Sequence, residues 1–82
     1  MYSIEFDPIA QAQADALPIE AINPFLELRA LLELQPWDGL PFNPENPKAN
    51  MLTQIFGSAG MATYLVVEHS RLVYIVRIEW LG

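Results

Sequence analysis

The sequence contains no cysteine and few basic residues. Among its 82 residues there are four Lys or Arg against ten Asp or Glu, which gives a formal net charge of −6. The absence of cysteine excludes disulfide bonds and thiolate metal sites, and it fits the reducing conditions of the cytoplasm. The shortage of basic residues argues against a protein that holds nucleic acid by its phosphates, since such proteins present a positive field. A basic protein partner fits this charge balance better.

Long hydrophobic runs and ligand-binding clusters are also missing. No apolar stretch approaches the roughly 20 residues of a membrane span, and Tyr2–Glu5 is not the basic-then-apolar start of a secretion signal. One histidine and scattered carboxylates cannot close a metal site, and there is no glycine-rich nucleotide-binding loop. We therefore expect no membrane insertion, no metal and no cofactor, and a cytoplasmic location.

What the chain does have is enough apolar character to fold. Hydrophobic residues make up 52% of the sequence, which is typical of a folded domain and not of a disordered chain. The length predicts a single domain over residues 1–82. A chain this short buries only about 60% of the surface that it exposes when unfolded. Apolar surface is therefore expected to remain, and a partner could cover it.

The first half of the chain predicts a strand followed by two helices. Apolar and polar residues alternate over Tyr2–Phe6, which is the period of a half-buried strand. Asp7 and Pro8 then combine a preferred N-cap with a first-turn proline, and good helix formers continue to Leu17. A second helix begins at about Ile19 or at Pro24 and runs to Leu34. Its apolar residues recur at steps of three and four: Phe25, Leu28, Leu31 and Leu32.

The segment Gln35–Asn50 is predicted to be an irregular connection. It holds four of the seven prolines together with a glycine and three asparagines, and no regular element is expected among so many breakers. Connections of this length in compact domains are usually functional or disordered. Trp37, Leu40 and Phe42 suggest that this one is pinned to the body of the domain. The strand Met51–Phe56 and a turn at residues 57–60 follow.

The segment Met61–Trp80 predicts a β-hairpin. If His69 and Ser70 form a two-residue turn, Val67 faces Leu72, and residues that face each other share one side of the sheet. One side is almost purely apolar and is expected to form the core under the two helices: Thr63, Leu65, Val67, Leu72, Tyr74, Val76, Ile78 and Trp80. The other side has an apolar centre and charged ends: Ala62, Tyr64, Val66, Glu68, Arg71, Val73, Ile75, Arg77 and Glu79.

The second side of the hairpin is the candidate binding surface. Two helices cannot cover both faces of a four-stranded sheet, so this side is expected to be open, and an apolar patch rimmed by charge is typical of a binding surface. The alternative is that the long Gln35–Asn50 connection folds over it. The candidate partner-binding residues are Tyr64, Val66, Arg71, Val73 and Ile75.

Three charged residues are candidates for chemistry. Arg77 lies mid-strand within predicted reach of Tyr64, where a guanidinium could clamp a phosphate or a partner's carboxylate. The alternative is an ordinary exposed ion pair with Glu79. Glu45 and Lys48 in the long connection could act as an acid–base pair, although charged loop residues usually serve only solubility.

The order of elements resembles the RelE/ParE superfamily of bacterial toxins. The stretch "YSIEFDPIAQAQADALP" is similar to the family's opening strand and first helix. The stretch "VVEHSRLVYIVRIEW" is similar to its closing hairpin, with an arginine about two-thirds along the last strand. The resemblance implies a small α+β fold: a strand, two helices and three antiparallel strands, with the helices on one face of the sheet.

The resemblance also implies a function and a set of partners. A type II toxin is expected to bind an antitoxin through its open sheet face, by a helix or an extended segment. Some members of the superfamily cleave messenger RNA on the ribosome and others poison DNA gyrase, so ribosome, mRNA and gyrase are candidate targets. A homodimer is a further option. The RNA-cleaving alternative would use Arg77 with Lys48 or Glu45, and a third alternative is a non-toxic interaction module on the same fold.

This chain departs from the pattern of the RNA-cleaving members. They carry several basic residues on the open face, and the matching positions here hold Leu52, Gln54 and Met61. A closing His or Tyr acid is expected near the C-terminus, where this chain has Glu79 and Trp80. Such cations stabilise the charge that develops during phosphoryl chemistry, and this stabilisation amounts to several kcal/mol. The departures favour protein binding over RNA cleavage.

Overall fold

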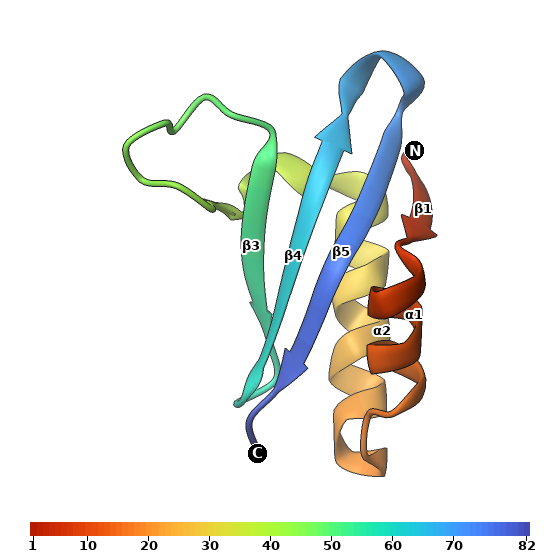
Figure 1. Ribbon diagram of the computed structural model, residues 1–82. Helices are drawn as coiled ribbons and strands as arrows, with labels where there is room; N and C mark the ends of the chain where they lie inside the picture. Colours follow the sequence, from red (N-terminus) through yellow and green to blue (C-terminus); the bar gives the residue numbers. More distant parts are fainter.

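The computed structural model describes all 82 residues, as two helices packed on one face of a five-stranded sheet. The strands are β1 (Ser3–Phe6), β2 (Leu40–Pro41), β3 (Met51–Phe56), β4 (Gly60–Val67) and β5 (Leu72–Trp80); the helices are α1 (Pro8–Asp15) and α2 (Ile19–Leu34); the short 3₁₀-helices are η1 (Pro36–Asp38) and η2 (Glu68–Ser70). The sheet order is β1-β5-β4-β3-β2, with β1 parallel to β5 and the other neighbours antiparallel. Figure 1 shows that the face of the sheet away from the helices is uncovered.

This architecture confirms the predicted α+β arrangement and adds one strand to it. The residues of β2 lie in the connection that was predicted to be irregular, and they pair with Leu52 and Thr53 of β3. Figure 1 shows that the part of this connection after β2, residues 42–50, projects away from the sheet edge. The loop therefore does not cover the open face. Neither helix is both long and apolar enough to cross a membrane.

Helix α1 forms where its cap signal indicated, whereas helix α2 begins without a side-chain cap. The Asp7 carboxylate accepts a hydrogen bond from the Ile9 backbone N–H at 3.0 Å, so it satisfies one of the free donors at the start of α1. Helix α2 begins at Ile19, so the earlier of the two predicted starts is correct and Pro24 lies inside the helix. A proline there removes one intrahelical hydrogen bond, but its ring packs against the turn at Gly57.

Helix α1 covers the part of β5 that β1 is too short to reach. Strand β1 ends at Phe6, and beyond it the Gln13 side chain accepts a hydrogen bond from the Ile78 backbone N–H at 2.8 Å. The Asp7 backbone N–H donates to the Ile75 carbonyl at 2.8 Å. Polar groups along this edge of the sheet are thereby satisfied within the chain, which leaves them unavailable to an added strand.

The core lies between the helices and one face of the sheet. Phe25 of α2 packs edge-on against Phe56 of β3, with ring centroids 5.5 Å apart, and lies 6.1 Å from the ring of Phe6. Aromatic pairs at such distances add about 0.5–1.5 kcal/mol beyond the area that they bury. The buried residues of the core are Tyr2, Ala10, Phe25, Leu28, Leu32, Leu52, Phe56, Ala62, Tyr64, Val66, Val73, Ile75 and Ile78.

The core side of the hairpin is the reverse of the predicted one over most of its length. Four residues that were predicted to be open are at most 2% exposed: Tyr64, Val66, Val73 and Ile75. Their neighbours Leu65, Val67, Leu72, Tyr74 and Val76, which were predicted to be the core, lie half-buried on the uncovered side. The assignment was wrong because both sides of the hairpin are apolar, and alternation separates two sides without saying which one the helices cover.

A β-bulge at Val76 changes which side of the sheet the last residues of β5 face. Pairing follows the predicted register from Val67 opposite Leu72 to Tyr64 opposite Ile75, and then Thr63 pairs with Arg77. Val76 therefore has no partner, and side-chain alternation along β5 slips by one residue. Because of this slip, Ile78 lies in the core and Arg77 lies on the uncovered side, as predicted, although the faces before the bulge are reversed.

Candidate partner-binding face

The uncovered side of the sheet, called the open face below, is mostly apolar. The strand register places its residues in rows across β3, β4 and β5: Met51, Leu65 and Tyr74; Thr53, Thr63 and Arg77; Ile55, Met61 and Glu79; Val67 and Leu72; with Val76 at the bulge. Ile55 is 68% exposed and Met61 37% exposed. Contiguous apolar surface of this kind on a small protein is typical of an interaction site.

The open face is hollowed at the end where β3 turns into β4. The hollow has a volume of roughly 170 Å³ and is lined by Ile55, Ala59, Gly60, Met61, Glu79 and Leu81. Most of its wall is hydrocarbon, and the Glu79 carboxylate is the one charged group in the lining. An apolar side chain of a partner, next to a basic group, would suit such a wall.

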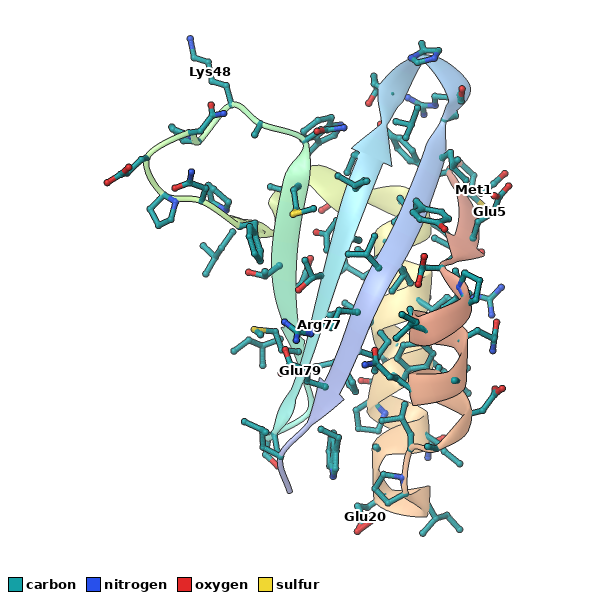
Figure 2. The ribbon with its side chains drawn as sticks, in the orientation of Figure 1. Met1, Glu5, Glu20, Lys48, Arg77 and Glu79 are labelled. Carbon is teal, nitrogen blue, oxygen red and sulfur yellow. The ribbon has the colours of Figure 1, made fainter.

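Arg77 is the basic side chain of the open face, and it is only loosely held. Its Nε lies 3.9 Å from the Glu79 Oε1, and the Arg77 side chain is 60% exposed. Figure 2 shows the two labelled side chains next to each other on the sheet. An exposed pair at this distance contributes little to stability, so the guanidinium is free to meet a partner's carboxylate. Tyr64, which was predicted to share its side of the sheet, points into the core instead.

The other two candidate catalytic residues do not lie near Arg77. Figure 2 places Lys48 on the projecting loop, well away from the labelled Arg77 on the sheet. Glu45 lies in the same loop, where its backbone N–H donates to the Asn43 side chain at 3.0 Å. No ion pair joins Glu45 to Lys48. The structure therefore does not gather the three residues into one site, and no group of three or more His, Asp or Glu side chains could hold a metal ion.

Arg71, a predicted partner-binding residue, is held in a network at the tip of the hairpin. Its Nη1 donates to Glu68 Oε2 at 2.9 Å and to the Tyr2 hydroxyl at 3.2 Å, and its guanidinium lies 4.2 Å from the centre of the Tyr2 ring. Glu68 Oε1 accepts from the Tyr2 hydroxyl at 2.6 Å and from Trp37 Nε1 at 2.7 Å. The network joins Tyr2, just before β1, to η1 and to the hairpin tip, so Arg71 has a structural role.

The donors around Glu68 change its acidity. The hydrogen bond from Tyr2 and then that from Trp37 stabilise the carboxylate, with Arg71 adding to them, and together they lower the pKa of Glu68 to about 2 from an ordinary 4.5. The charged form of Glu68 is thus the one that holds Trp37 and the start of the long loop in place. Sequence reasoning did not find this cluster, because its members are far apart in the chain.

Tyr64 also has a structural role. Its hydroxyl donates to the Pro36 backbone carbonyl at 2.7 Å, and burial is the main cause that raises the pKa of Tyr64 to about 12. A Cβ added at Gly39 would collide with this hydroxyl and would lie 2.8 Å from the Thr53 carbonyl oxygen. A glycine is therefore needed where the loop passes over Tyr64, and this residue cannot contact a partner directly.

One signal in the sequence could have identified the open face. Strand β1 has polar residues on one side, Ser3 and Glu5, and apolar residues on the other. In the structure Ser3 aligns with Leu72 and Glu5 with Tyr74. The polar side of β1 therefore marks the solvent side of β5. Using this signal requires the parallel β1–β5 pairing, which is a long-range contact that local periodicity does not reveal.

Comparison with known proteins finds likeness at the level of structure. No family model and no curated protein matches the chain. The isolated RelE toxin of E. coli superposes with a TM-score of 0.83 at 12% identity, over 100% of this chain and 86% of that chain. The toxin–antitoxin complex RelBE2 of Mycobacterium tuberculosis gives 0.80 at 18% identity, over 96% of each chain. The archaeal RelE–RelB complex of Pyrococcus horikoshii gives 0.65 at 18% identity, over 99% and 96%. The chain therefore has the fold seen in RelE toxins, as the resemblance implied.

Proposed function

We propose that this chain is the toxin, or a toxin-like component, of a bacterial type II toxin–antitoxin system and that it binds its antitoxin through the open face. The observation that carries the proposal is a largely apolar sheet face left uncovered in a chain with the RelE fold. One of the structures that it resembles is a toxin–antitoxin complex, and another is a complex of RelE with RelB. The chain has no cysteine, and we expect it to act in the cytoplasm.

The residues expected to carry binding are the half-buried apolar ones at the centre of the open face. Leu65, Tyr74 and Val76 lie side by side across β4 and β5. Removing such surface from water contributes about 25 cal/mol per Å². A partner's helix laid across the strands, or an extended segment, could cover the centre. Arg77 and Glu79 would then set the partner's register by pairing with charges of opposite sign.

The composition of the open face supports protein binding rather than RNA cleavage. Stabilising a developing phosphorane requires several positive groups at the reacting phosphate. Only Arg77 supplies one on this face, and its nearest charged neighbour is the Glu79 carboxylate. Lys48 lies on the projecting loop. We therefore place the function of this surface in recognition of a protein.

The experiment is growth of bacteria in which the chain alone is induced, followed by co-expression with the product of the adjacent reading frame. We expect growth arrest that the second protein relieves, and a purified complex of the two. Tyr74→Glu should abolish the complex, because it adds a charge at the centre of the open face. Ile9→Glu is the matched control, since Ile9 is 67% exposed on α1 and lies off the open face.

The result is decisive in both directions. Unimpaired growth with abundant folded protein, and no complex with any adjacent product, would overturn the proposal. If Tyr74→Glu and the Ile9→Glu control bind equally well, the antitoxin does not use the open face. If growth does arrest, sequencing of cleaved messenger RNA and an assay of gyrase activity in the arrested cells would identify the target.

A further inference from the structure

Helix α2 carries apolar residues on two opposite sides. One side packs on the sheet through Ala21, Phe25, Leu28 and Leu32, which are at most 8% exposed. A second set lies on the outward side and occupies about a third of the helix circumference at 3.6 residues per turn. These residues, called the outer stripe below, are Ile19, Ile22, Leu26, Ala30 and Leu34.

The outer stripe is too exposed and too regular to be ordinary surface. Ile19 is 86% exposed, Leu26 53% and Leu34 65%. Single exposed apolar residues are common on proteins, but these recur at steps of three and four along the whole helix, over about 22 Å. A helix that is apolar on opposite sides is usually covered on both. No other element of the chain covers the outward side of α2.

Charges beside the outer stripe indicate what kind of partner it fits. Glu20 and Glu27 lie along one border, while Glu33, like Asn23, falls within the arc of the stripe itself, between Ile22 and Leu26. None of these three glutamates forms an ion pair. The two ion pairs of the molecule involve Glu68 and Glu79 instead. Figure 2 shows the labelled Glu20 directed away from the body of the molecule. The border therefore presents carboxylates that no group within the chain neutralises.

The one basic residue of α2 does not offset these carboxylates. Arg29 lies on the opposite border, next to Ile22, but its guanidinium lies 5.8 Å from the centre of the Phe6 ring, on the side of β1. A second copy of this chain would bring glutamates against glutamates, which disfavours pairing of two α2 helices. A helix with an apolar seam bordered by Lys or Arg would bury the outer stripe and pair with the glutamates.

We propose that the outer stripe of α2 docks a basic amphipathic helix of a protein partner. The site lies on the far side of the molecule from the open face, because the helices separate it from the sheet (Figure 1). The inference does not depend on the proposed function, since it rests on α2 alone. One partner chain could occupy both surfaces, or two partners could each occupy one.

The test uses the full chain and a synthetic probe. The probe is a helical peptide of about four turns, with leucine at the seam positions and lysine at the bordering positions. Its matched control has glutamate in place of each lysine. We expect the basic peptide to bind with micromolar affinity that weakens as salt is added, and the acidic peptide not to bind.

Two variants separate the apolar stripe from diffuse charge attraction. Leu26→Glu adds negative charge, which by itself would strengthen attraction to a basic peptide, yet it interrupts the stripe. We expect it to weaken binding by about ten- to hundredfold, the equivalent of losing one buried leucine. Ile9→Glu adds the same charge on α1 and should not weaken binding. Ile22→Gln, with no change in charge, should weaken binding in the same direction as Leu26→Glu.

Several outcomes would overturn the inference. Equal binding by Leu26→Glu and Ile9→Glu would mean that charge alone holds the peptide. Equal binding of the acidic and basic peptides would remove the role of the glutamates. Self-association of the chain that Leu26→Glu abolishes would assign the stripe to a second copy. Tyr74→Glu should leave peptide binding unchanged, so failure of this inference and failure of the proposed function give different results.

Discussion

Tyr64 donates a hydrogen bond of 2.7 Å from its hydroxyl to the backbone carbonyl of Pro36. The contact ties the buried middle of β4 to the 3₁₀-helix η1 that opens the long loop. Tyr64 itself is completely buried. Its hydrogen bond therefore stabilises the sheet on the side opposite the open face, where the helices lie.

Tyr64→Phe should destabilise the fold. The substitution keeps the ring but leaves the buried Pro36 carbonyl without its donor, which costs about 1–3 kcal/mol. Urea unfolding measures this loss. The control is Tyr74→Phe, whose hydroxyl makes a longer contact, 3.2 Å to Asp7, on the half-buried side of β5. Equal losses in the two variants would mean that the buried hydroxyl of Tyr64 contributes no more stability than the half-buried hydroxyl of Tyr74.

Val73→Glu and Tyr74→Glu should behave in opposite ways, because neighbouring residues of β5 face opposite sides. Val73 is completely buried, and an unpaired carboxylate there costs about 3–5 kcal/mol, which is comparable to the total stability of so small a domain. Val73→Glu should therefore fail to fold, as circular dichroism would show. Tyr74→Glu should fold and lose only partner binding. A folded Val73→Glu protein would contradict the assignment of the two faces.

Deleting Val76 should be tolerated. Val76 has no partner in the β4–β5 ladder, and its removal leaves Ile75 opposite Tyr64 and Arg77 opposite Thr63. Side chains beyond the deletion keep their faces, so a modest loss in melting temperature is expected. Deleting Tyr74 is the contrasting change. It moves the side chains of neighbouring β5 residues to the opposite side of the sheet. If both deletions unfold the chain to the same degree, the bulge is not at Val76.

Acid should weaken the tie at the hairpin tip. The pKa of Glu68 is lowered to about 2 in the folded chain, against an ordinary 4.5. The stabilisation from its charged form is therefore complete above pH 4.5 and is lost as the pH falls from 4.5 through about 2. Urea midpoints measured across this range should fall more steeply for the parent chain than for Glu68→Gln. Parallel curves for the two proteins would show that the carboxylate gives no such contribution.

Local patterns in the sequence were sufficient for the two helices and for four of the five strands, all but β2. The N-cap at Asp7, the spacing of apolar residues in α2 and the alternation in the hairpin each act over a few residues, so their physical consequences can be read without knowing the rest of the structure. The hairpin register from Val67 opposite Leu72 onward was also predictable, since the position of the turn determines it. Arg77 lies on the open face as predicted only because two departures from the prediction cancel: the faces before the bulge are reversed, and the bulge at Val76 reverses them again.

Only the tertiary structure decided which side of the hairpin is buried. Both sides are apolar, so the free energy of burial is similar for either choice when the hairpin is considered alone. The parallel pairing of β1 with β5 breaks the tie, because it aligns Ile4 with Val73 and Phe6 with Ile75 under the helices. The contact between Tyr64 and Pro36 reinforces the same choice. These are long-range contacts, and a sequence does not display them until the chain is folded.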